Sequence, residues 1–144
     1  MKRSLVVIVI IVLAISSVCA ADFNVLTLNF QPWGNTQFEA ETMKITWTGE
    51  WEGGGWWLSR DCSAYDYATI EFEEPLPMDV IVTVIYSATD EKNEKLKSKK
   101  TILAGKKNIN IILDPTYKVS IDGLGISGSA PGTIILKSLM LKEK

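Results

Sequence analysis

The stretch that decides the fold is Val80–Ile85, which reads Val-Ile-Val-Thr-Val-Ile. Every residue in it is β-branched, and such side chains favour extended backbone over helix. A short run of this kind, without alternation of apolar and polar residues, is typical of a strand covered on both faces. We therefore expect Val80–Ile85 to lie in the middle of a sheet whose other strands come from the rest of the chain.

Segments with strand-like alternation lie on both sides of this run. In Met43–Thr48, for example, Met43, Ile45 and Trp47 share one apolar face, because successive side chains of a strand point to opposite sides. The other expected strands are Val25–Phe30, a strand that begins at Trp56-Trp57-Leu58, Tyr67–Phe72, the lysine-rich Leu96–Leu103, Asn108–Leu113, Tyr117–Asp122 and Thr133–Leu141.

Turn signals separate these segments at short intervals. They are Gln31–Asn35, Gly53–Gly55, Pro75 with Pro77, the polar loop Thr89–Glu94, Asp114-Pro115 and the glycine-rich stretch Gly123–Gly132. No helical periodicity is found after residue 20. About nine or ten short strands in this spacing predict a β-sandwich or barrel.

The first 20 residues have the pattern of a secretory signal peptide. Lys2 and Arg3 form a basic start, Leu5–Ile15 is apolar, and small residues follow up to Ala20. The apolar run is shorter than a membrane-spanning helix requires. We expect cleavage before Ala21, which leaves a β-domain of residues 21–144, without a membrane span, that is secreted or held in the cell envelope (periplasmic or extracellular). Anchoring as a lipoprotein through Cys19 is the less favoured alternative.

Composition excludes several classes of function. Without Lys2 and Arg3 the domain has a formal net charge of −4, which does not favour nucleic acid as a partner. The chain contains no histidine, so it lacks the commonest general base and metal ligand. Cleavage would also leave Cys62 as the only cysteine. We expect Cys62 to be a small buried apolar residue, with an interchain disulfide as the alternative.

All five tryptophans lie between Trp33 and Trp57, which is more than the core of one small sandwich needs in a single stretch. Trp47 is in phase with Ile45 and is expected in the core. Of the neighbours Trp56 and Trp57 one must face outward, and Trp57 is favoured because it shares a face with Ser59. Trp33 and Trp51 lie in turn-like sequence, and turns run over the surface.

Exposed indole rings on a rigid scaffold suit carbohydrate binding. The flat, electron-rich indole face packs against the C–H face of a pyranose ring, while polar side chains hydrogen-bond the sugar hydroxyls. We expect the exposed rings to be coplanar. The expected carbohydrate-binding residues are Trp33, Trp51 and Trp57, with Asn35, Gln37, Glu50, Arg60 and Asp61 as polar partners. No catalytic residues, metal ligands or cofactors are expected.

Two segments resemble secreted carbohydrate-binding modules of the galactose-binding-like, jelly-roll type. The first runs from Gly55-Trp56-Trp57-Leu58 through Asp61–Tyr67 to Ile70-Glu71-Phe72. The second comprises Gly125–Gly128, Pro131–Ile134 and Leu136–Ser138, and is similar to the last two strands of such modules. The resemblance extends from about Phe30 to Leu141. It implies an all-β jelly-roll β-sandwich of two antiparallel sheets, here about 8–10 strands, that binds a polysaccharide or oligosaccharide. It also implies a companion glycanase or surface protein as a partner, since such modules are usually attached to catalytic domains.

Two other functions are weighed against glycan binding. A structural or adhesive surface protein would use the same aromatic patch to bind another protein. A glycosidase would need two carboxylates flanking a cleft. Glu50, Glu52, Glu71, Glu73 and Glu74 are numerous enough for that role, but Glu71 and Glu73 share one strand face and are interpreted as solvated.

The remaining charged residues are given structural interpretations. The lysines between Lys92 and Lys107 could bind an acidic glycan, but protection of a sheet edge against pairing is the favoured interpretation. Asp22, Glu39 and Glu41 could supply oxygens to a structural calcium ion. No loop has a ligand spacing like that of an EF-hand, so no metal is expected.

Overall fold

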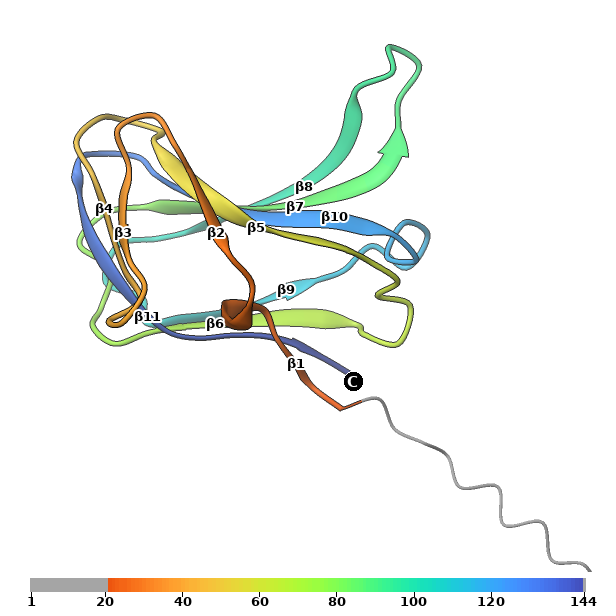
Figure 1. Ribbon diagram of the computed structural model, residues 1–144, viewed down its shortest axis with the longest axis horizontal. Helices are drawn as coiled ribbons and strands as arrows, with labels where there is room; N and C mark the ends of the chain where they lie inside the picture. Colours follow the sequence, from red (N-terminus) through yellow and green to blue (C-terminus); the bar gives the residue numbers. More distant parts are fainter. Residues whose placement is uncertain (1–20, 144) are drawn as a thin grey trace, which may run out of the picture.

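The computed structural model describes residues 21–143 and shows an all-β chain in which two antiparallel sheets form a sandwich (Figure 1). This confirms the predicted fold class. The signal peptide expected at residues 1–20 lies outside the described residues. Within the part that is described, no helix is long and apolar enough to cross a membrane.

One sheet has five strands in the order β2-β5-β10-β7-β8, and the other has the order β3-β4-β11-β6-β9 with β1 added beside β11. A single 3₁₀ turn, η1, follows β1. The strands are β1 (Phe23–Asn24), β2 (Phe30–Trp33), β3 (Gln37–Glu39), β4 (Lys44–Trp47), β5 (Gly53–Arg60), β6 (Tyr67–Phe72), β7 (Val80–Thr89), β8 (Lys95–Ile102), β9 (Asn108–Ile112), β10 (Ile121–Gly128) and β11 (Gly132–Lys142).

The core fills the space between the two sheets. Trp47 and Trp56 are its largest members. Trp47 is 1 % exposed, and its indole Nε1 donates a 2.6 Å hydrogen bond to the carbonyl oxygen of Ala130. Trp56, which is 2 % exposed, packs edge-on against Phe30 with a centroid separation of 4.9 Å. Both tryptophans were expected to be core candidates, and Trp57 is the outward member of its pair as predicted.

Two glycines make room for the aromatic rings of the core. A Cβ built on Gly128 would lie 2.2 Å from the ring of Trp47, and one built on Gly54 would lie 2.1 Å from Cζ of Phe30. Contacts this short are not compatible with any side chain larger than hydrogen. The rings therefore rest directly on the backbone of β10 and β5.

The run Val80–Ile85 is an interior strand, as expected, but it is not covered on both faces. Along β7 buried residues alternate with half-buried ones, and Ile81, Thr83 and Ile85 form the half-buried side. That side is the outer face of the five-stranded sheet, where no second layer covers it. The β-branched run thus predicted the strand correctly, but the prediction that both of its faces are buried is wrong.

Several expected boundaries are wrong. Val25–Thr27 forms the 3₁₀ turn η1, in which Asn24 Oδ1 accepts a hydrogen bond from the Leu26 amide. Most of Tyr117–Asp122 is turn rather than strand, and β10 starts only at Ile121. Conversely, Gln31–Trp33, Gly53–Gly55 and Gly123–Gly128 lie within strands. Pro32 is tolerated because β2 is an edge strand.

The lysine-rich strand β8 is the other edge of the five-stranded sheet, which agrees with its interpretation as a protected edge. Cys62 is fully buried, with its Sγ 3.6 Å from the carbonyl oxygen of Arg60. Burial raises the pKa of the Cys62 thiol to about 11, an increase that the nearby charge of Arg60 only partly offsets. The expectation of a small buried residue is confirmed.

Gly128→Ala tests the contact between backbone and ring. The added methyl group must displace the fully buried Trp47, so we expect a loss of about 3 kcal/mol in the free energy of unfolding, measured by urea denaturation. Ser127→Ala, one residue earlier in the same strand, is the control and should unfold near the wild-type midpoint. Equal midpoints for both variants would contradict the proposed contact.

Candidate functional site

The exposed tryptophans Trp33 and Trp57 lie on the outer face of the five-stranded sheet. Trp33 ends β2 and is 40 % exposed, while Trp57 lies in β5 and is 53 % exposed. In β5 the neighbours of Trp57 along the strand, Trp56 and Leu58, point into the core. Strand alternation therefore forces Trp57 outward, where about half of its surface is open to solvent.

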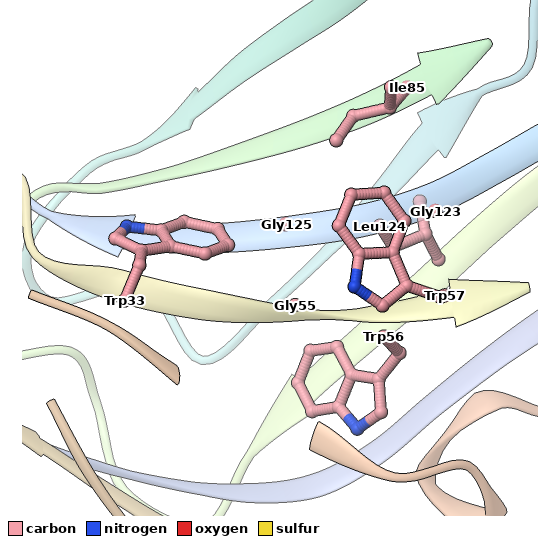
Figure 2. Close-up of a pocket in the computed structure, with 8 residues that line it drawn as sticks. All are labelled: Trp33, Gly55, Trp56, Trp57, Ile85, Gly123, Leu124 and Gly125. Atoms are coloured by element: carbon pink, nitrogen blue, oxygen red, sulfur yellow. The ribbon is translucent and has the colours of Figure 1, made fainter. Parts of the chain in front are cut away.

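A floor of glycines lies between and beneath the two indoles. Gly55 of β5 is paired with Gly125 of β10, and Gly123 is paired with Trp57. A Cβ on Gly125 would lie 3.0 Å from Cη2 of Trp33, and one on Gly123 would lie 2.9 Å from Cε3 of Trp57. Each ring thus leans over a residue without a side chain, as Figure 2 shows. A shallow hollow remains between the rings, lined also by Ile85 and Leu124.

The expectation of coplanar rings is not met. In Figure 2 the ring of Trp33 is seen nearly edge-on while that of Trp57 is seen from its face, on either side of Gly55 and Gly125. The difference arises because the rings come from different strands and lean on different glycines. Two successive stacking surfaces are therefore inclined to one another.

Polar side chains lie close to the tryptophans on the same face. Gln31 on β2 is paired with Gly55. On the other side of Gly55 lies Gly125, which is paired with Thr83 on β7. Ser127 and Ile81 continue the row that starts at Trp33 and Gly53. Sequence reasoning did not select Gln31, Thr83 or Ser127. The signal that could have found them is strand parity, but it was hidden because Gln31 and Ser127 were assigned to turns.

Trp51 lies in the turn between β4 and β5 and is 54 % exposed. It precedes by two residues Gly53, the strand partner of Trp33, so it lies at the same end of the sheet. Its backbone has φ 62°, a left-handed conformation that costs a residue with a side chain about 1 kcal/mol or more. Its amide donates a 2.7 Å hydrogen bond to the carbonyl oxygen of Gly128, which holds this conformation.

The polar residues expected to assist the tryptophans are dispersed. Arg60 places its guanidinium 3.9 Å from the ring centroid of Phe23, a residue of the opposite sheet. Asp61 accepts a 2.8 Å hydrogen bond from the Ser63 amide, which stabilises a local turn. The Ser63 side chain, followed by this amide, lowers the pKa of the Asp61 carboxyl group. Gln37 lies on β3 in the opposite sheet. None of these three residues belongs to the row between Trp33 and Trp57.

Asn35 and Glu50 lie in turns at the end of the sheet where Trp33 and Trp51 are found. Asn35 is engaged by Glu52, because both its amide N–H and its side-chain Nδ2 donate to Glu52 Oε1 at 3.2 Å. Glu50 is exposed and immediately precedes Trp51. Both residues remain predictions as sugar ligands.

Glu52 is the residue that links the two turns beside the tryptophans. Its Oε2 also accepts hydrogen bonds from the Thr48 amide at 3.0 Å and the Gly49 amide at 2.9 Å. The bond from the Asn35 amide, followed by those of the two other amides, lowers the pKa of Glu52. One carboxylate thus ties the turn after Trp33 to the turn that carries Trp51. Sequence reasoning considered Glu52 as a candidate catalytic acid and as a polar neighbour of the tryptophans, and did not predict this structural role.

The carboxylates weighed for catalysis or metal binding have structural partners at two of their positions. Glu71 forms a 2.7 Å ion pair with Lys137, and both residues lie in the six-stranded sheet, away from the exposed tryptophans. Glu39, one of the residues weighed for calcium, pairs at 2.6 Å with Lys44, whose hydrogen bond lowers the pKa of Glu39. Among residues 21–143, no group of three or more potential ligands is placed to hold a metal ion.

No protein-family model and no curated protein matches the sequence. Two solved structures share its fold. One is CBM86, a low-affinity xylan-binding module from Roseburia intestinalis: the TM-score is 0.61 at 19 % identity, over 86 % of this chain and 95 % of that one. The other contains the CBM22-1 and GH10 modules of Clostridium thermocellum endo-1,4-β-D-xylanase 10B in complex with xylohexaose. Its TM-score is 0.57 at 15 % identity, over 85 % of this chain and 27 % of that one.

At these identities the likeness concerns the fold, and it confirms the resemblance found in the sequence. The chain has the β-sandwich fold seen in carbohydrate-binding modules.

Glu52→Gln tests the link between the two turns. Since the folded pKa of Glu52 lies below its ordinary value of 4.5, its charge contributes stability that is present above that value and is lost as pH falls through the folded pKa. We expect the melting temperature of the variant to lie below that of the wild type at pH 7, and this difference to narrow as pH falls below 4.5. Thermal melts followed by circular dichroism measure this. Glu50→Gln is the control, and a gap that is independent of pH would count against the charge.

Proposed function

We propose that this protein binds polysaccharide on the outer face of the five-stranded sheet and catalyses no reaction. The observation that carries the proposal is the pair of uncovered indoles, Trp33 and Trp57, leaning over Gly125 and Gly123. An exposed aromatic patch of this kind is typical of a binding surface, because contact between apolar side chains and water is unfavourable. Pyranose rings present C–H faces that suit indole faces, while Gln31, Thr83 and Ser127 can hydrogen-bond hydroxyl groups.

The shape of the site favours an internal stretch of a chain over a chain end. The face is a shallow hollow without a closing wall, so a long ligand can enter and leave at both ends. Because the planes of the two indoles are inclined to each other, they suit a glycan in which successive sugar rings are rotated about the chain axis. Xylan is the first ligand to test, since the two solved structures compared above are a xylan-binding module and part of a xylanase in complex with xylohexaose. Export by the predicted signal would bring the domain to such glycans.

Trp33→Ala and Trp57→Ala test the proposal. Stacking one sugar covers roughly 55 Å² of apolar indole surface, which at about 25 cal/mol per Å² corresponds to about 1.4 kcal/mol, or about tenfold in affinity. We expect each variant to lose about that factor in affinity electrophoresis on xylan and on a panel of other β-glycans.

The control for these variants is Ile112→Ala, which removes a 79 % exposed apolar side chain from the opposite sheet and should leave binding unchanged. The proposal fails if the folded wild type is retarded by no glycan. An oligomer that dissociates in the Trp57→Ala variant would then favour a surface that binds protein.

Trp51→Gly tests whether the third exposed tryptophan takes part in binding. Glycine adopts φ 62° freely, so removing the strained tryptophan should leave the free energy of unfolding unchanged or raise it by up to about 1 kcal/mol. If Trp51 contacts the glycan, affinity falls while stability does not. Urea denaturation and glycan titration of the same sample measure both. Unchanged affinity would remove Trp51 from the site.

A further inference from the structure

The outer face that carries the tryptophans continues onto the lysine-rich edge strand β8. Antiparallel register places Trp57, Gly123, Ile85 and Lys97 in one row across four strands. The next row runs from Gly55 through Gly125 and Thr83 to Lys99. Directly paired residues project to the same side of a sheet, so Lys97 and Lys99 extend the face that holds the indoles.

The distance along these rows suits a side branch of the ligand. The ring of Trp57 leans over Gly123 on β10, and β8 lies two strands further on, at roughly 10 Å in the sheet plane. The hollow between them is lined by Trp57, Ile85, Lys97 and the neighbouring Lys95, Glu94 and Asp122. A single sugar branching from a stacked chain, together with an extended lysine side chain, can span this gap.

The charges of Lys97 and Lys99 are not used within the fold. Lys95, the first lysine of the strand, forms a 3.1 Å ion pair with Asp122 and donates a 3.0 Å hydrogen bond to the carbonyl oxygen of Ser87. Asp122 is also held by the Ser87 hydroxyl, which lowers the pKa of its carboxyl group. By contrast, Lys97 and Lys99 are exposed and form no ion pair with any residue of the described range 21–143.

We propose that Lys97 and Lys99 bind carboxylate groups carried by the glycan, so that the preferred ligand is a polysaccharide with uronic acid branches. This inference rests on the proposed function of the tryptophan face and specifies its ligand class. A neutral glycan would gain nothing from two free ammonium groups, whereas a carboxylate can pair with them. Glu94 lies at the same hollow and opposes the effect, which leaves Lys99 as the less compensated of the two.

Protection of a sheet edge is the competing account of these lysines, and it differs in one respect. Edge protection requires charge anywhere along β8. Binding requires charge on the outer face only. Lys100 separates the two accounts: it is exposed on the same strand but is paired with the core residue Val82, so it projects to the other side. Lys97→Gln and Lys99→Gln can therefore be compared with Lys100→Gln.

The experiment uses one xylo-oligosaccharide with a single glucuronic acid branch and the same compound after its carboxyl group is reduced to an alcohol. Calorimetric titration at about 20 mM salt should give wild-type binding that is about threefold to tenfold tighter for the acid form, because one or two exposed ion pairs contribute that much. The preference should disappear at about 0.5 M salt. It should also be lost in Lys97→Gln/Lys99→Gln, which keeps wild-type affinity for the reduced form, and be retained in Lys100→Gln.

The possible failures are distinguishable. Equal affinity of the wild type for both forms overturns the inference but leaves glycan binding in place. A preference that Lys100→Gln loses as fully as the double variant also overturns it, since overall charge would then be the cause. Absence of binding to either form, with thermal melts showing a folded protein, overturns both the inference and the proposed function.

Discussion

The close approach of aromatic rings to bare backbone on the strand pair β5–β10 is the constraint on which this structure depends. Toward the core, Phe30 lies against Gly54 and Trp47 lies against Gly128. Toward solvent, Trp33 leans over Gly125 and Trp57 over Gly123. Strand alternation separates these two sets, so a single glycine-rich pair of strands seats rings on both faces. The strand pair β5–β10 thus supports both the core and the candidate binding surface.

This coupling explains why the sheet is firm enough to present indoles. A ring held against backbone has little freedom to rotate, so little conformational entropy remains to be lost on binding. The carboxylate of Glu52 adds a second restraint, because it fixes the turns that follow Trp33 and precede β5. Rigidity here comes from hydrogen bonds and packing, without a disulfide in the described part of the chain.

The sequence predicted the fold class and the inward or outward orientation of Trp47, Trp56 and Trp57, because residue parity in a strand needs only local information. The prediction of strand boundaries failed at glycines, because glycine is common in turns but also occurs in strands where an aromatic ring approaches the backbone. Gly53–Gly55 and Gly123–Gly128 have the composition of turns, yet they lie in strands. At Gly54, Gly123, Gly125 and Gly128 a ring from another strand fills the space of the missing side chain. Such compensation comes from distant residues, and no window along the chain reveals it.

The positions of the candidate polar partners Arg60 and Asp61 relative to the tryptophan face could not be predicted, for the same reason. Nearness in sequence to a tryptophan placed Arg60 and Asp61 among them, whereas the bulge between Ile121 and Gly123 and the left-handed Ser59 (φ 45°) divert the end of β5. Gln31 and Thr83 share the tryptophan face only through register across strands. Register depends on the whole sheet, and it is therefore the last property that a single sequence discloses.

The pairing of β1 with β11 has a consequence for attachment. Phe23 faces Leu141 in this ladder, and Asp22 forms a 3.6 Å ion pair with Lys142, so the first and last described residues emerge together. Figure 1 shows β1 and the end of β11 in the six-stranded sheet, whereas Trp33 and Trp57 lie on the outer face of the five-stranded sheet. A cargo joined closely at either terminus would therefore lie behind the domain and leave the tryptophan-bearing face accessible.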